Sequence, residues 1–168
     1  MSQGCAWVFG DDVDTDALAP GLYMKGSMEE LARHCLESVD PVFAGQVAAG
    51  DIVVAGGNFG VGSSREQAAQ VLKILGVGAI LARSFGGIFY RNAFNNGLLV
   101  LVCAEVERIN RGDNLQLDAA AGKVKNITTG ETLECEPVPS HLMDLVKAGG
   151  LVPYLERQLA QEGKEQTR

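Results

Sequence analysis

The chain has 168 residues, of which 46% are hydrophobic, and its formal net charge is −7. This length and composition are typical of one folded domain, and we expect residues 1–168 to form one, with a core over about 6–156 and a frayed tail over 161–168. An acidic chain is a poor partner for nucleic acid or an anionic membrane surface. No apolar run reaches the roughly 18 residues of a membrane span, and the first residues lack the basic and apolar segments of a signal peptide, so we expect a cytoplasmic protein.

Cysteine and histidine residues are too scattered to predict a metal site. None of the cysteines forms a C-x-x-C pair, and the two histidines are far apart in the sequence. We therefore expect no metal on this chain and reduced thiols that pack as small apolar groups. The residues concerned are Cys5, Cys35, Cys103, Cys135, His34 and His141.

The first predicted element is an apolar strand over 6–9, which ends at Gly10 and is followed by four aspartates within residues 11–16. An EF-hand calcium loop starting there would need glycine at its sixth position and glutamate at its twelfth, where this chain has Asp16 and Leu22. Two interpretations stay open. The run is either a polar turn that caps a short helix beginning near Asp16, or a set of carboxylates that orients a cation such as Arg65.

A loop bounded by proline and glycine covers 19–26, and a helix is expected after it. Ser27 and Glu30 have the spacing of a capping box, which predicts the helix start. Leu31 and Cys35 would lie on its inner face, and Pro41 ends this stretch.

Residues 51–55 predict a short buried strand, and a loop with four glycines follows over 56–62. A helix is then expected, with one apolar face at 68, 71, 72 and 75. Ser64 and Gln67 have capping-box spacing at its start, and Gly76 is placed to end it in the left-handed conformation.

A strand, a glycine-rich turn and a helix start together predict an anion site. Free N–H groups and the positive end of the helix dipole favour carboxylate or phosphate, and Arg65 adds a fork-shaped cation. The alternative is an ordinary connection whose glycines only permit tight turns. The spacing matches neither a dinucleotide fingerprint, nor a P-loop, nor a nucleophile elbow.

Residues 79–82 predict a second buried strand, 84–97 a helix with Phe85, Ile88, Phe89 and Asn92 on one face, and 98–102 a third strand. The order strand, helix, strand, helix, strand over 51–102 predicts an α/β fold with a mostly parallel central sheet.

The chain changes character after residue 102. A short helix over 106–111 precedes a small antiparallel meander at 114–118, 123–127 and 131–135, with Thr129-Gly130 as the last turn. A helix with Leu142, Leu145 and Val146 on one face ends at 149–150, and residues 152–159 add a last turn.

Three motifs in this order resemble the swivel domain of the aconitase family. They are Asp14-Thr15-Asp16, Asn58-Phe59-Gly60-x-Gly62-Ser63-Ser64-Arg65-Glu66 and Ser84-Phe85-x-x-Ile88-Phe89-x-x-Asn92. The chain length and the ending over 148–155 resemble the free-standing small subunits of 3-isopropylmalate dehydratases. The likeness covers roughly residues 6–156 and implies an aconitase-swivel-like three-layer fold and a place in leucine biosynthesis.

The resemblance implies a hydro-lyase that removes and re-adds water on a hydroxy dicarboxylate, active only with a large subunit that carries a [4Fe–4S] cluster. Ser63 matches the family's catalytic serine, which as an alkoxide takes a proton from the carbon next to a carboxylate. Ser64 and Arg65 match residues that bind substrate carboxylates. Asp14, Thr15 and Asp16 match the acidic turn, to which we assign a supporting role behind the substrate-binding residues.

The loop over 21–27 reads the substrate's variable group in this family. Here it contains Leu22, Tyr23, Met24 and Lys25. The tyrosine and methionine favour a small alkyl group, and the lysine either pairs with a carboxylate or faces solvent. Isopropylmalate, 2,3-dimethylmalate or citramalate, and homoaconitate stay open as substrates, in that order.

Two further positions depart from many relatives, which carry Cys at Val61 and His at Gln67. Neither is the base, so we expect activity to survive. A competing hypothesis from another class is a carboxylate-binding or assembly module without catalysis. A stand-alone serine hydrolase is disfavoured because no histidine lies within the motif. Whether the isolated chain forms a homo-oligomer stays open.

Overall fold

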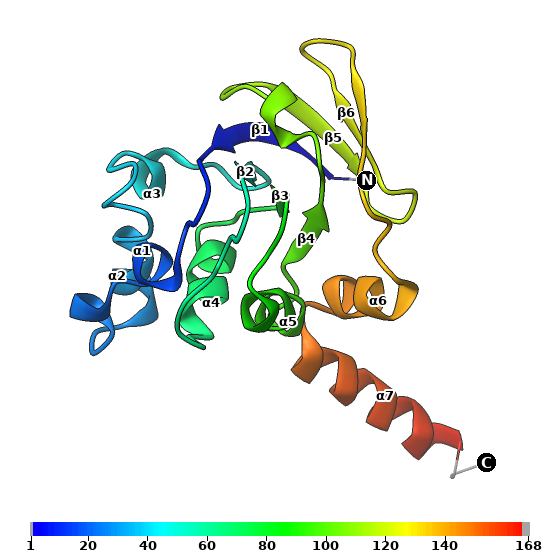
Figure 1. Ribbon diagram of the computed structural model, residues 1–168. Helices are drawn as coiled ribbons and strands as arrows, with labels where there is room; N and C mark the ends of the chain where they lie inside the picture. The colour runs from blue at the N-terminus through cyan, green and yellow to red at the C-terminus, as the bar shows by residue number, and fades with distance from the viewer. Residues whose placement is uncertain (1, 166–168) are drawn as a thin grey trace.

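The computed structural model describes residues 2–165, in which seven strands form one curled sheet (Figure 1). The strand order is β4-β3-β2-β1-β5-β6-β7. The strands are β1 (Ser2–Val8), β2 (Ile52–Ala55), β3 (Ala79–Ala82), β4 (Leu99–Val102), β5 (Asn114–Asp118), β6 (Lys123–Asn126) and β7 (Thr132–Glu134). The first four are parallel to one another, and β5 to β7 form an antiparallel meander.

The parallel half confirms the expected alternation over 51–102. Every residue of β2 and β3 is buried, as apolar strands covered on both faces should be, and Val53 pairs with Ile80. The crossovers are α4 (Gln67–Ile74) and α5 (Gly87–Asn95). Gly76 takes the expected left-handed conformation just after α4, with φ +83°.

The antiparallel meander is also confirmed, but it joins the main sheet, which the sequence does not predict. β1 begins at Ser2 because its first residues pair antiparallel with β5, and Gly4 lies opposite Leu115. The predicted turn is present: the N–H of Gly130 donates to the carbonyl of Asn126 at 2.8 Å.

Helices cover the parallel strands, and α4, α5 and α6 pack side by side beneath them (Figure 1). On β1, Trp7 and Phe9 both pack edge-on against Phe43 of α3, with ring centroids 5.3 and 5.4 Å apart. The remaining helices are α1 (Thr15–Leu18), α2 (Met28–Arg33), α3 (Phe43–Gln46), α6 (Ser140–Ala148), α7 (Leu151–Glu165) and the 3-10 turns η1 (Gly21–Tyr23) and η2 (Val106–Arg108).

The helix α5 is shorter than predicted and buries a different face. It begins at Gly87 instead of residue 84, and its buried side chains are Phe89, Ala93 and Phe94, whereas Ile88 is 49% exposed. The start shifts because the preceding residues bond to the glycine-rich loop: the N–H of Gly86 donates to the carbonyl of Phe59 at 2.8 Å.

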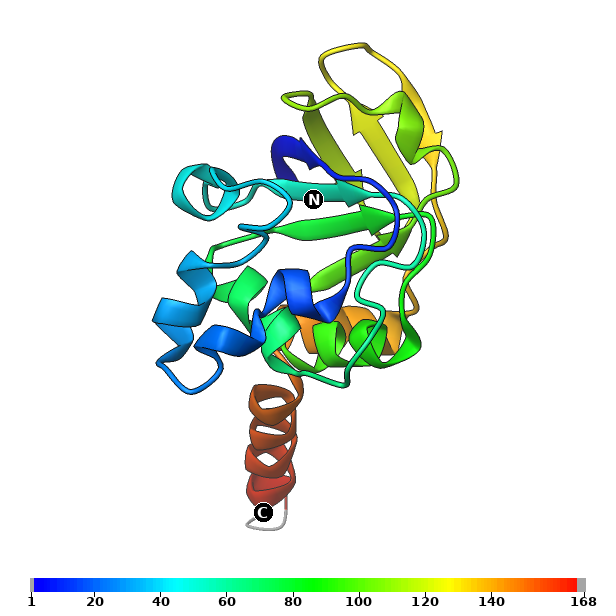
Figure 2. The same cartoon turned by 60° about the vertical axis from the view of Figure 1, so that its left-hand side comes forward.

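The helix α7 is longer than the predicted last turn. It contacts α5 and α6 and extends away from the sheet as far as Glu165 (Figure 2). The expected frayed tail starts at 161, and its residues 161–165 are helical; glutamine, glutamate and lysine are strong helix formers, although Gly163 is not. Residues 166–168 of the expected tail lie outside the described residues. No helix within 2–165 combines the length and apolar character needed to cross a bilayer.

Candidate functional site

The acidic turn and the glycine-rich loop run side by side from the carboxyl ends of β1 and β2. Four backbone hydrogen bonds join the two segments. The loop N–H groups of Gly56 and Gly60 donate to the carbonyls of Gly10 and Val13, at 3.0 and 2.7 Å. The turn N–H groups of Asp12 and Thr15 donate to the carbonyls of Gly57 and Val61, both at 2.9 Å. Ligand sites of parallel α/β sheets lie beyond these strand ends, so both motifs are in the expected place.

The third motif joins the same loop. The N–H of Asn58 donates to Ser84 Oγ at 2.8 Å, and the N–H of Phe59 donates to the Ser84 carbonyl at 3.0 Å. The three motifs that are separate in the sequence therefore form one cluster at the edge of the sheet.

Two glycines permit the path of the loop. Gly60 has φ +77°, and a Cβ there would lie 2.2 Å from Cγ of Phe89. Gly62 has φ +116°, and a Cβ there would lie 3.0 Å from Oγ1 of Thr15. Both positions combine a left-handed backbone with a close neighbour, so the loop can approach α1 and α5 only with glycine.

Ser63 follows this glycine and is held by the acidic turn. Its N–H donates to Oγ1 of Thr15 at 3.0 Å, and Thr15 itself is only 2% exposed. The side chains of Ser63 and Ser64 are both exposed. The structure therefore fixes the backbone of the serine while leaving its hydroxyl open to a ligand.

Ser64 does not cap α4, so the predicted capping box is wrong. The helix begins at Gln67, its N-cap residue is Glu66, and no side chain caps it. The backbone before α4 takes another path, because the N–H of Ser63 is held by the distant Thr15 at 3.0 Å and the N–H of Arg65 turns back to the Ser63 carbonyl at 2.8 Å. Among the hydrogen bonds of residues 2–165, none uses the N–H of Ser64, Glu66 or Gln67, so these groups are available as donors.

Arg65 is anchored through one end of its guanidinium group. Nη1 donates both to Asp16 Oδ1 and, at 3.0 Å, to the Ala19 carbonyl. Nη2 has no protein acceptor within the described part of the chain. Both interpretations of the acidic turn are therefore correct: Asp14 caps α1 by accepting the N–H of Ala17 at 2.7 Å, and Asp16 orients Arg65.

Sequence reasoning missed a second anchored arginine next to this cluster. Arg83, directly after β3, pairs with Asp11. Asp11 also accepts the N–H of Gly57 at 2.7 Å, and that hydrogen bond, together with Arg83, lowers the pKa of Asp11 below its usual value. The sequence shows Asp11 as part of the acidic run, but no motif marks Arg83 as its partner, and only the fold brings the two side chains together.

The loop expected to read the substrate begins beside Arg65: a Cβ on Gly21 would lie 3.8 Å from Nη2 of that arginine. Leu22 is 83% exposed, and Lys25 is exposed as well. Tyr23 stacks on His34 with ring centroids 3.5 Å apart.

Met24 in the same loop is partly buried against the core. Burial, followed by the nearby charge of Glu37, raises the pKa of Tyr23. Tyr23 and Met24, the two residues expected to favour an alkyl group, thus both pack against the core. The exposed apolar residue of the loop is Leu22.

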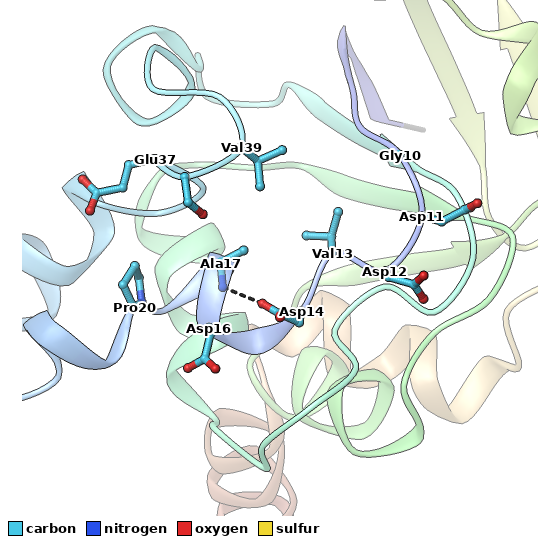
Figure 3. A pocket seen from close by; sticks show the side chains of 11 residues that line it. Gly10, Asp11, Asp12, Val13, Asp14, Asp16, Ala17, Pro20, Glu37 and Val39 are labelled. Carbon is cyan, nitrogen blue, oxygen red and sulfur yellow. Dashed lines mark hydrogen bonds between the residues drawn. The ribbon is translucent and has the colours of Figure 1, made fainter.

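A cavity beside the acidic turn does not suit an anionic ligand (Figure 3). It measures about 560 Å³, and its charged lining side chains are all acidic: Asp11, Asp12, Asp14, Asp16 and Glu37. Ser63 and Arg65 do not line it. Carboxylates repel an anion, so the candidate anion site is the open surface formed by Ser63, Ser64 and Arg65.

The donor set of this chain does not fit an iron–sulfur cluster. Within residues 2–165, no three His, Cys, Asp or Glu side chains are grouped to hold a metal ion. Cys35 and Cys103 are buried, Cys135 is half-buried, and Cys5 is exposed on β1.

The fold and the joined motifs define an aconitase-type domain, and residues 17–106 match the family model of the aconitase C-terminal domain. The chain is 49% identical over 159 residues to 3-isopropylmalate dehydratase small subunit 1 of Thermotoga maritima, covering 94% of this chain and 96% of that protein. It is 45% identical over 161 residues to the isopropylmalate/citramalate isomerase small subunit of Methanocaldococcus jannaschii, covering 95% of this chain and 96% of that protein. It therefore belongs to the family of 3-isopropylmalate dehydratase small subunits.

A solved structure agrees with this family. The crystal structure of 3-isopropylmalate dehydratase from Methanocaldococcus jannaschii superposes with a TM-score of 0.92 at 41% sequence identity, covering 97% of this chain and 98% of that chain. The resemblance stated from the three motifs and the predicted α/β fold are both confirmed.

Proposed function

We propose that this chain supplies one half of a dehydratase active site, namely the proton-transfer base and the carboxylate clamp, and that it is active only with a large subunit. The observation that carries the proposal is the pairing of an exposed Ser63 with an anchored Arg65 on one loop. The names of the relatives, which are small subunits, support a larger partner.

Ser63 is proposed to accept the proton from the substrate carbon next to a carboxylate and to return it in the reverse direction. A serine hydroxyl is a weak base at neutral pH, so its oxyanion needs nearby donors and positive charge. The unused N–H groups at 64, 66 and 67 and the start of α4 supply donors on the same turn. The hydrogen bond from the Ser63 N–H to Thr15 holds the backbone that carries the hydroxyl.

Arg65 is proposed to bind a substrate carboxylate through Nη2. Asp16 and the Ala19 carbonyl occupy Nη1, so the fork is oriented before the ligand arrives and loses little freedom on binding. Ser64, exposed beside it, adds a hydroxyl donor. The departure of the substrate hydroxyl is proposed to take place on the large subunit, where we also place the [4Fe–4S] cluster, because the donors of this chain do not fit one.

The preferred substrate is proposed to be isopropylmalate. Leu22 offers an exposed apolar side chain, which suits a small alkyl group, and it directly follows Gly21, where a Cβ would lie 3.8 Å from Nη2 of Arg65. The Methanocaldococcus relative, described as an isopropylmalate/citramalate isomerase subunit, supports citramalate as a further candidate, and 2,3-dimethylmalate and homoaconitate follow. We also propose that the chain acts as one domain in the cytoplasm, a location that its free thiols support.

The test is reconstitution with its large subunit. After anaerobic rebuilding of the cluster, hydration of isopropylmaleate, dimethylmaleate, citraconate and homoaconitate is compared. We expect isopropylmaleate to give the highest kcat/KM. A complex that hydrates homoaconitate best would contradict the role of Leu22, and a correctly assembled complex that hydrates none of the four would contradict the substrate class.

A further inference from the structure

Two thiols meet where the curled sheet closes on itself. Cys103 directly follows β4 and Cys135 directly follows β7, the two strands at opposite ends of the strand order. The two cysteines are nevertheless paired as antiparallel bridge partners. The chain that leads from β7 to α6 therefore passes beside the end of β4 (Figure 1).

The backbone geometry of this bridge suits a disulfide. The N–H of Glu136 donates to the Val102 carbonyl at 2.8 Å. The N–H of Cys135 does not bond to Cys103 and donates instead to the Gly122 carbonyl at 2.7 Å. The cysteines thus form a non-hydrogen-bonded pair, the closer of the two antiparallel types, with Cα atoms typically about 4.5 Å apart. Disulfides span Cα separations of roughly 4.4–6.8 Å, so the bond needs little backbone movement.

The two sulfur atoms also differ in access and in acidity. Cys103 is fully buried, whereas Cys135 is half-buried. Hydrogen bonding between the two thiols lowers the pKa of Cys103 and raises that of Cys135, and Cys103 Sγ also donates to the Glu134 carbonyl at 3.8 Å. Cys35 is buried without such a partner, and burial alone raises its pKa.

We propose that Cys103 and Cys135 form a redox modification site, a dithiol that a peroxide converts into an intrachain disulfide. One of the two sulfurs, as its thiolate, attacks one peroxide oxygen, the O–O bond breaks, and a sulfenic acid and one water (or alcohol) are formed. The other sulfur then attacks the sulfenic sulfur, the S–O bond breaks, and hydroxide leaves and takes up a proton as a second water. Two electrons pass from the sulfurs to the peroxide, and both thiol protons end in the released products.

The crosslink would act on the edge of the sheet that leads to the candidate site. The N–H of Cys103 donates to the Ala82 carbonyl at 2.9 Å, and the next residue of that strand end, Arg83, donates to the Gly56 carbonyl at 3.1 Å. A disulfide there ties β4 to the segment after β7 and closes a long loop in the unfolded chain. We expect the oxidised full chain to melt about 5–10 °C higher than the reduced chain.

The experiment treats the full chain with a small excess of hydrogen peroxide and compares it with dithiothreitol-reduced protein. Intact mass after alkylation counts the free thiols, and peptide mapping locates the bond. We expect a mass loss of two hydrogens, a Cys103–Cys135 peptide and reversal by dithiothreitol. The Cys5→Ser variant should behave the same, whereas Cys135→Ser should keep its melting temperature after peroxide treatment.

Three results would overturn the proposal: both thiols alkylated to full extent after peroxide, Cys135 carrying two or three oxygens while Cys103 stays free, or a disulfide that joins two chains through Cys5. Since a variant can fail to fold for other reasons, peptide mapping of the unaltered chain decides the question by itself, and Cys135→Ala serves as a second variant.

Discussion

Thr15 is the contact through which the acidic turn controls the position of Ser63. Its hydroxyl accepts the N–H of Ser63 at 3.0 Å, and its side chain is almost fully buried. Replacing it with valine keeps the shape and β-branching of the side chain but removes the acceptor. The hydrogen bond is thereby deleted with little change in packing.

The magnitude follows from what the hydrogen bond does. One neutral hydrogen bond contributes about 1 kcal/mol to the free energy of unfolding, so Thr15→Val should lower the melting temperature by about 2–4 °C. A base that shifts by a fraction of an ångström loses far more in the transition state. We expect kcat to fall roughly 10- to 100-fold, with KM within about threefold.

The assay is the initial rate of isopropylmaleate hydration by the complex rebuilt with the large subunit. Thr15→Ser is the matched control, because it keeps the hydroxyl and loses a buried methyl group worth about 1 kcal/mol, so its stability should match that of Thr15→Val. The serine variant should keep its kcat. A valine variant within twofold of wild type, or a serine variant that loses as much, would refute the positioning role.

Three other changes test the rest of the site. Arg65→Lys removes the planar guanidinium group, so steady-state kinetics should show KM about tenfold higher with a smaller change in kcat. A fall in kcat with an unchanged KM would contradict a role of Arg65 in substrate binding. Gly60→Ala places a Cβ 2.2 Å from Phe89 at φ +77°, and urea unfolding should show a loss of about 2–4 kcal/mol, whereas an unchanged midpoint would contradict the geometry. The Gly57 N–H and Arg83 lower the pKa of Asp11 in the folded state. The contribution of the Asp11 carboxylate to the free energy of unfolding is therefore complete above its unfolded pKa near 3.8 and is lost as the pH falls through the lower folded pKa. The difference in unfolding free energy between wild type and Asp11→Asn should therefore shrink below about pH 4, and a difference that grows there would contradict the assignment.

Elements fixed by local chemistry were predictable. The apolar runs of β2 and β3 are continuous because both faces are covered, and Ser27 caps α2 by accepting the N–H of Glu30 at 3.1 Å, as the capping-box spacing indicates. Ser64 has the same spacing but does not cap, because the loop before α4 is held by Thr15 and turns at Arg65. Tertiary hydrogen bonds thus overrode a local preference.

Features that depend on distant partners were not predictable in the same way. The first residues of β1 show no apolar pattern of a strand and become one only because β5 pairs with them. The pairing of Arg83 with Asp11 has no motif to reveal it. In the site itself, the residue types of Ser63 and Arg65 were readable from the loop, but the orientation of the guanidinium by Asp16 required the fold.

The central claim is that Ser63 is the base, and the most direct measurement is the turnover of a Ser63→Ala complex. The N–H bond to Thr15 and the Arg65 clamp do not involve the deleted oxygen, so the complex should assemble and bind substrate with a KM within a few-fold of wild type. We predict that kcat falls by about 10²–10⁴-fold, the range of a lost general base. A kcat close to that of wild type would contradict the account.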